Sequence, residues 1–225
     1  MVNFEGAIKR PFQDFKKLGI GALMYMIPIL NIVTGFFSSG YGLECAKTAM
    51  KKDYNLPEWA DWGNLLIKGF LCFLISVIYF IPLAIITAII SGPILSSSLN
   101  ALISSNPQAL VSALGAAGST LVAVALIGLL TIYVVPTAIM LFVDKGNFSD
   151  AFKFGMVFKK AFTSKYFTAW IIVMIYSFVV GLVAGFLSTI TTVTVILPLI
   201  IMGFANMILV ITSMTLFGEV YSEIK

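Results

Sequence analysis

The sequence contains no histidine, only two cysteines, and almost no charge over most of its length. Histidine is the side chain that most often acts as a general base or as a zinc ligand near neutral pH, so its absence argues against both kinds of site. The two cysteines, Cys45 and Cys72, are too few for a disulfide framework. We therefore expect no catalytic, metal-binding or cofactor-binding residues, and no enzymatic activity.

Two long segments, residues 69–143 and 166–218, contain no Asp, Glu, Lys or Arg. A soluble domain exposes one face of nearly every element to water, whereas a membrane-spanning helix needs about 20 consecutive apolar residues. With 60% hydrophobic residues and a mean hydropathy of +1.03, the chain is predicted to be an all-α integral membrane protein. The polar stretches are too short for a separate soluble core, so residues 1–225 are expected to form one membrane domain.

The 14 Lys and Arg residues lie in short blocks beside the apolar segments. They occur before residue 18, in the segments 47–68 and 145–165, and at Lys225, whereas the intervening connections contain none. Because short cytoplasmic loops collect Lys and Arg, this distribution predicts that both termini face the cytoplasm and that helices cross the cell membrane in pairs. The net charge of +4 is interpreted as attraction to anionic lipid headgroups, because the basic residues lie beside apolar segments. Nucleic acid is not expected as a partner.

Six helices arranged as three hairpins are expected, with short amphipathic segments on the cytoplasmic side. The hairpins cover about residues 12–50, 65–143 and 166–218. In the second hairpin, helices at about 65–90 and 119–143 are predicted to be joined by an uncharged amphipathic helix on the outer surface, followed by a turn at Asn106-Pro107.

The first hairpin is the shortest, and its tip is predicted at Pro28 and Asn31. Proline disfavours a helical conformation in the residue before it, and asparagine is common in turns. Two helices cut from residues 18–43 would reach only about 20 Å each, short of a hydrocarbon core of roughly 30 Å. We therefore expect the helices to extend to about residues 12 and 50, with a re-entrant pair as the alternative.

A group of motifs follows the first hairpin: Gly40-Tyr41-Gly42-Leu43, then Lys47, then Asn55-Leu56-Pro57-Glu58-Trp59-Ala60-Asp61-Trp62, and Gly69. This combination resembles an uncharacterised, largely archaeal membrane family, domain of unknown function 4013. A helix ending in Gly-Tyr, a basic stretch and a Pro-x-aromatic-x-Asp turn are typical of that family. The resemblance implies six helices, supports the first hairpin, and transfers no catalytic or binding residue.

The turn around Pro57 holds three acidic residues, Asp53, Glu58 and Asp61. A metal site needs converging oxygen ligands, and acid-base catalysis needs carboxylates in unlike environments. With lysines beside them, these residues are interpreted as a solvated turn in which Asp61 caps the next helix. Trp59 is expected to anchor the turn at the membrane interface.

Three positions in the last two expected helices are candidates for packing or function. Gly181 and Gly185 lie in a row of small residues spaced by four in the helix expected at about 166–189, which lets helices approach closely in lipid. A contact with another helix of the same chain is expected, and a homo-oligomer through this helix is the alternative. Asn206 in the last helix is expected to form an interhelical hydrogen bond rather than to contact a solute.

Together these features predict a structural, lipid-organising or partner-scaffolding role. Membrane lipids and a protein at the cytoplasmic face are the expected partners, and the basic amphipathic stretch at residues 149–162 is expected to lie on the inner leaflet. The alternative is a transporter or channel for an uncharged or lipid-like solute, with proline-kinked helices and Asn206 along the path. Ion-coupled transport is disfavoured because the expected spans lack ionisable groups.

Overall fold

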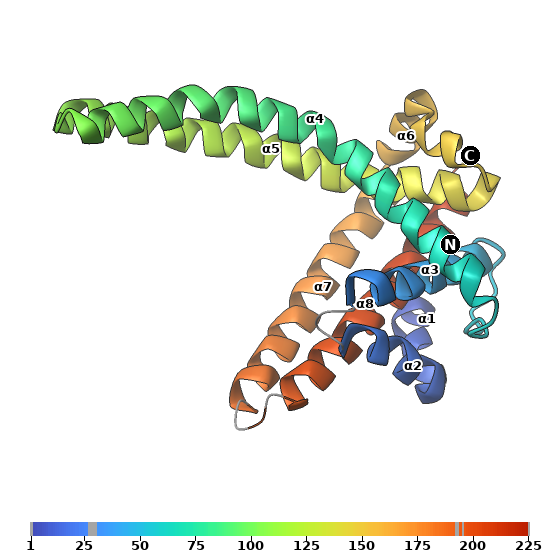
Figure 1. The fold of residues 1–225 in the computed structure, drawn as a ribbon. Coiled ribbons are helices and arrows are strands. Elements are labelled where there is room, and N and C mark those ends of the chain that lie inside the picture. Colours follow the sequence, from blue (N-terminus) through green and yellow to red (C-terminus); the bar gives the residue numbers. More distant parts are fainter. Residues whose placement is uncertain (1, 27–30, 192–193, 195, 225) are drawn as a thin grey trace. The chain divides into compact units, whose positions relative to one another are not determined.

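The computed structural model describes residues 2–26, 31–191, 194 and 196–224, and these residues are almost entirely helical (Figure 1). No strand occurs among them, which confirms the all-α prediction. In chain order, with η for a short 3-10 helix, the elements of the described residues are α1 (Phe4–Lys9), η1 (Arg10–Gln13), α2 (Phe15–Met26), α3 (Asn31–Met50), α4 (Trp62–Ile103), α5 (Pro107–Lys145), η2 (Phe148–Phe152), α6 (Phe154–Ala161), α7 (Ser164–Ile190) and α8 (Ile196–Glu223).

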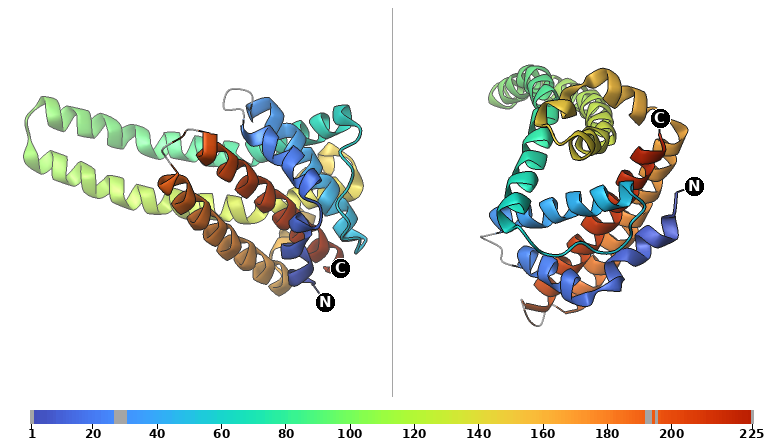
Figure 2. Two further views of the ribbon diagram at one scale, coloured as in Figure 1. Left: turned by 90° about the horizontal axis from the view of Figure 1, so that it is seen from below. Right: turned by 90° about the vertical axis from the view of Figure 1, so that its right-hand side faces the viewer.

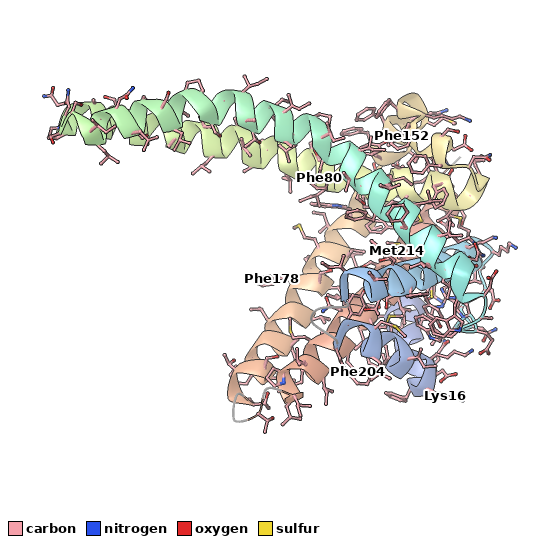
Figure 3. All side chains as sticks on the ribbon, in the orientation of Figure 1. Lys16, Phe80, Phe152, Phe178, Phe204 and Met214 are labelled. Atoms are coloured by element: carbon pink, nitrogen blue, oxygen red, sulfur yellow. The ribbon has the colours of Figure 1, made fainter. Side chains whose placement is uncertain are left out.

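Four segments of the described chain are long and apolar enough to cross a membrane. They are α4, the part of α5 that begins at Thr120, α7 and α8. Their outward side chains are largely apolar, as Phe178 on the outer face of α7 illustrates (Figure 3). Lipid solvates such surfaces and water does not, which indicates a membrane protein.

The chain divides into two compact units. The first unit contains residues 1–74 and 136–225, and the second contains residues 75–135. In the second unit, α4 and α5 run side by side in opposite directions, with Leu83 packed beside Gly128 (Figure 2). This unit is therefore a simple pair of apolar helices.

The separate amphipathic helix expected between these two helices is not found, because α4 continues to Ile103 and α5 begins at Pro107. The serine hydroxyls are satisfied within this helix, because they donate to carbonyl oxygens of the preceding turn, as Ser98 does to Ile94 at 2.8 Å. The chain turns at Asn106, where a turn was expected, and the Asn106 side chain caps α5. At 1.5 Å per residue, the 42 residues of α4 extend about 63 Å, roughly twice the thickness of a hydrocarbon core.

In the first unit, α8 is the central helix, and α2, α3 and α7 pack against it. Two glycines of α8 allow backbones to approach closely: Gly203 faces the carbonyl oxygen of Ala22 in α2, and Gly218 faces that of Ala46 in α3. A Cβ at Gly218 would lie 2.5 Å from the Ala46 oxygen, so a larger residue does not fit without movement. The helix continues to Glu223, beyond the end expected from the sequence.

The helices α2 and α3 occupy the region of the expected first hairpin. α2 begins at Phe15 rather than near residue 12, and α3 begins at Asn31 and ends at Met50, the expected limit. Pro28, the predicted tip, lies outside the described residues. The 12 residues of α2 extend about 18 Å, which is too short to cross a hydrocarbon core of about 30 Å.

Candidate functional site

The side chain of Arg10, at the start of η1, is completely buried. Its Nη1 donates hydrogen bonds to the carbonyl oxygen of Cys45 (2.8 Å) and to Thr215 Oγ1 (2.9 Å). Its Nη2 donates to Thr48 Oγ1 (2.5 Å) and to the carbonyl oxygen of Asn55 (2.7 Å). These four bonds tie the N-terminal segment to α3, to α8 and to the loop that follows α3.

A buried carboxylate, that of Glu219, lies one helical turn beyond Thr215 in α8. Its Oε1 accepts a hydrogen bond from the backbone N–H of Asn3 at 2.9 Å, while its Oε2 has no hydrogen-bond partner in the described part of the chain. Burial, with the neighbouring Glu219 carboxylate, raises the pKa of the Tyr54 hydroxyl above its ordinary value. Arg10 and Glu219 thus form a polar layer that fastens the N-terminal segment to α8.

The sequence gives no clear signal for either buried charge. Arg10 follows Lys9, which is exposed and pairs with Glu5 at 2.5 Å, so adjacent basic residues have opposite environments. Glu219 is the first charged residue after a long apolar segment, which marks the end of the segment and not the burial of the side chain.

The loop of residues 51–61 is held against α2 and α3 by aromatic side chains. Tyr41 is buried and stacks on Trp59, with ring centroids 4.1 Å apart, and Trp59 stacks on Trp62 at 5.4 Å. The Tyr41 hydroxyl donates to the carbonyl oxygen of Pro57, and Trp59 Nε1 donates to that of Lys17, both at 2.9 Å. The structure thus brings Tyr41, Pro57 and Trp59 together; Trp59 is partly buried in this cluster, and its role as an interface anchor stays a prediction.

Gly40 and Asp61 determine how α4 leaves this loop. A Cβ at Gly40 would overlap the backbone of Leu65, and a Cβ at Gly69 would overlap the backbone of Phe36. The helices α3 and α4 therefore cross in direct backbone contact. Asp61 caps α4, as expected, because its Oδ1 accepts a hydrogen bond from a first-turn amide at 3.3 Å.

The glycines of α7 contact no other helix within the described residues. Gly181 and Gly185 are exposed, and no atom lies within 4 Å of a Cβ added at either position. Ala184 lies between them in sequence but is buried on the side of α7 that packs against α8. The expected contact within the chain at Gly181 and Gly185 is therefore wrong: their spacing shows that they share a face, but not which face meets a neighbour.

Asn206 forms its hydrogen bond within its own helix. Its Nδ2 donates to the carbonyl oxygen of Met202 at 2.8 Å, and the residue is partly exposed. The interhelical hydrogen bond predicted for Asn206 is therefore wrong. A local bond of this kind satisfies the amide without a partner helix, so a polar residue in an apolar helix does not by itself indicate an interhelical contact.

An apolar groove of about 430 Å³ lies between α7 and α8. Residues of both helices form its walls, and Phe12 of η1 also contributes to its lining. Most of its lining is aliphatic or aromatic, including Tyr176, Val179, Val183, Ala184, Ile201 and Phe204. Val179 and Val183 are about half exposed, at 50% and 53%, so the groove is open along α7 rather than closed. Asn206 is not among its lining residues.

A second pocket, of about 520 Å³, lies where the C-terminal ends of α3, α5 and α8 meet α6. We call it the basic pocket, and its polar lining includes Lys47, Lys51, Asp144, Lys145, Lys160 and Tyr221. Asp144 accepts a hydrogen bond from the Tyr221 hydroxyl and pairs with Lys145, each at 3.2 Å. Burial lowers the pKa of Lys160, and the Asp144 carboxylate opposes this change.

The described residues contain no group of three or more His, Cys, Asp or Glu side chains that could hold a metal ion. No curated protein and no solved structure matches the chain. The family model described as protein of unknown function (DUF4013) matches residues 23–189, well over half of the sequence. This range includes the Tyr41, Pro57 and Trp59 cluster and the crossing of α3 and α4. The chain therefore belongs to the DUF4013 family.

Proposed function

We propose that this protein is a non-enzymatic, multi-pass membrane protein that organises lipid in the cell membrane. The observation that carries the proposal is the apolar groove between α7 and α8. Both helices are long and apolar enough to cross a membrane, and the groove lies on their surface with half-exposed valines along its edge. In a bilayer, the molecules that surround such a groove are acyl chains.

Dispersion contacts, rather than the hydrophobic effect, favour an acyl chain in this groove. Lipid tails are as apolar as the valines and isoleucines of the groove, so burial of apolar area gives no net driving force there. An unfilled groove, however, leaves its lining atoms without dispersion contacts on one side. A chain lying in the groove restores these contacts and becomes less mobile than the surrounding lipid.

Both termini are proposed to face the cytoplasm, with six helices in three pairs. This topology is supported by the basic pocket, because the C-terminal ends of α3, α5 and α8 line it together with α6. It is also supported by Arg10, which bonds to Thr48 near the end of α3 and to Thr215 near the end of α8. The short α2, whose Met26 lies beside Gly203, favours a first pair that enters the bilayer without crossing it.

Photo-crosslinking tests the lipid-organising role. The full chain is reconstituted in phosphatidylcholine vesicles that contain a lipid with a diazirine in its acyl chain, and labelled residues are mapped by mass spectrometry. We expect strong labelling of Ile201 and Phe204 in the groove. Val183→Trp should fill the groove and reduce this labelling, whereas Leu182→Trp, on the neighbouring exposed position, should not. Uniform labelling of all apolar helix faces, unaffected by Val183→Trp, would contradict the proposal.

Passage of a lipid-like solute is the second candidate function, because the same groove is open along its length and offers a lateral route. It differs from lipid organisation in requiring net movement across the bilayer. Fluorescent lipid translocation in vesicles separates the two: transport predicts flux that depends on the protein and is blocked by Val183→Trp, and lipid organisation predicts none.

A further inference from the structure

The basic pocket carries a surplus of positive charge that the protein does not neutralise. Four lysines and one acidic residue, Asp144, line it. The Asp144 carboxylate is already engaged by Lys145 and by the Tyr221 hydroxyl. Neither Lys47 nor Lys51 forms an ion pair with a described residue. The pocket therefore has two exposed ammonium groups without a protein anion beside them.

Other lysines at this end of the first unit are paired with carboxylates. Lys68 contacts Glu44 at 2.5 Å, and Lys52 and Lys165 contact Glu223 at 3.7 and 3.3 Å. The carboxylates of Glu44 and Glu223 thus form ion pairs with lysines outside the basic pocket. Lys16 and Lys159 also form no ion pair in the described part of the chain, but Lys47 and Lys51 are unpaired lysines that line one pocket together.

The helix ends that meet at the pocket present carbonyl groups, whose partial negative charge would repel an anion. Lys160 offsets this effect for α8: its ammonium donates to the carbonyl oxygens of Tyr221 (3.4 Å) and Ile224, and lies 4.2 Å from the centre of the Tyr221 ring. Lys160 therefore caps the end of α8 and leaves Lys47 and Lys51 as the groups available to a ligand.

Apart from Ser222, the remaining lining of the basic pocket is apolar and includes Met50, Leu141 and Met156. A ligand that suits both kinds of wall has an anionic group joined to a hydrocarbon part. Lysine binds phosphate as a point charge, and phosphate groups of anionic lipids lie at the membrane surface where helix ends emerge.

We propose that the basic pocket binds the phosphate group of an anionic lipid headgroup, held by Lys47 and Lys51, with the adjoining carbon chain along Met50 and Met156. This inference rests on the proposed membrane function and names the lipid class at a site separate from the groove. The pocket supplies headgroup selectivity, which an apolar groove does not provide.

Binding of phosphatidylglycerol and of phosphatidylcholine to the full chain in detergent is compared by native mass spectrometry. The wild-type protein should prefer phosphatidylglycerol. The double variant Lys47→Gln, Lys51→Gln should bind it at least about tenfold more weakly. The control variant Lys16→Gln, Lys159→Gln removes the same charge from exposed positions outside the pocket and should bind within about twofold of wild type. Thermal unfolding in detergent checks that both variants are folded.

Equal binding of the two lipids to wild type, or equal loss in both double variants, would overturn the proposal, because the second result indicates a general surface charge. Competition by inorganic phosphate identifies the source of the phosphate. Full displacement of the lipid at low millimolar phosphate would show a site for soluble anions and would also overturn it. The groove is tested separately, by diazirine labelling of Ile201 and Phe204. An error in the proposed function and an error in the basic-pocket proposal therefore appear in different measurements.

Discussion

The guanidinium of Arg10 donates to the carbonyl oxygen of Cys45 at 2.8 Å, which joins the N-terminal segment to the last turns of α3 inside the protein. The carbonyl and the Thr48 hydroxyl lie near the negative end of the α3 dipole, so a positive charge is favourable there even though no described carboxylate forms a salt bridge with it. Arg10 therefore acts as a structural connection between segments that are distant in sequence.

Replacing Arg10 by Met should destabilise the protein strongly. The change removes a charged donor from the carbonyl oxygen of Cys45 and from the buried Thr215 hydroxyl, and a hydrogen bond to a charged group contributes about 1.5–3 kcal/mol. We expect a loss on the order of 3 kcal/mol, measured by denaturant unfolding in detergent. Arg10→Lys should be intermediate, because one ammonium cannot reach all four acceptors. Lys16→Met, at an exposed position, is the control, and equal stability of both methionine variants would refute the role of Arg10.

Glycine substitutions should separate close helix crossings from lipid-facing positions. Gly40→Ala and Gly69→Ala place a Cβ into the opposing backbone, so each should lower stability by about 1–3 kcal/mol. Gly181→Ala adds a methyl group in open space and should be neutral or stabilising by up to about 1 kcal/mol, because alanine favours helix. Thermal unfolding in detergent measures the difference. A large loss for Gly181→Ala would indicate that α7 meets a second copy of the chain.

The sequence predicts the apolar helices well because lipid requires long charge-free segments, and it predicts their ends less well. Residues 91–103 contain serines and asparagine, which are typical of a connection, yet the segment is helical, and its serine hydroxyls are satisfied by carbonyl oxygens of the same helix. Helix pattern alone therefore does not distinguish a polar connection from a helix that extends beyond the bilayer.

The candidate site depends on contacts between distant segments, which a single sequence does not encode directly. Gly40 and Gly181 both lie inside helices that contain further glycines, but one lies at a helix crossing and the other faces outward. Arg10 and Lys9 are adjacent basic residues, but only Arg10 is buried. The motif around Tyr41 and Trp59 was recognisable from its residues, whereas the basic pocket was not, because its lysines come from two basic blocks that are far apart in the sequence.

Asn206→Leu should change stability by less than about 1 kcal/mol. The amide of Asn206 bonds to the Met202 carbonyl of the same helix, so leucine removes no contact between helices and leaves the backbone of α8 intact. Unfolding in detergent is the measurement, with Met207→Ala as the contrast, because Met207 is completely buried against α2 and should lose about 2–5 kcal/mol. A comparable loss for Asn206→Leu would show that its amide has a structural partner in the membrane.

Cysteine accessibility in intact cells tests the proposed topology. Cys45 and Cys72 are buried, so the unmodified protein should react little with an impermeant thiol reagent. Ser104→Cys, in the exposed turn between α4 and α5, should be labelled from outside, because these helices are longer than the hydrocarbon core is thick. Ala60→Cys, exposed in the loop before α4, should be labelled only after the cells are permeabilised, because the basic segments flanking this loop favour the cytoplasmic side. Labelling of Ala60→Cys in intact cells would reverse the assignment of this loop, and with it the proposed position of both termini.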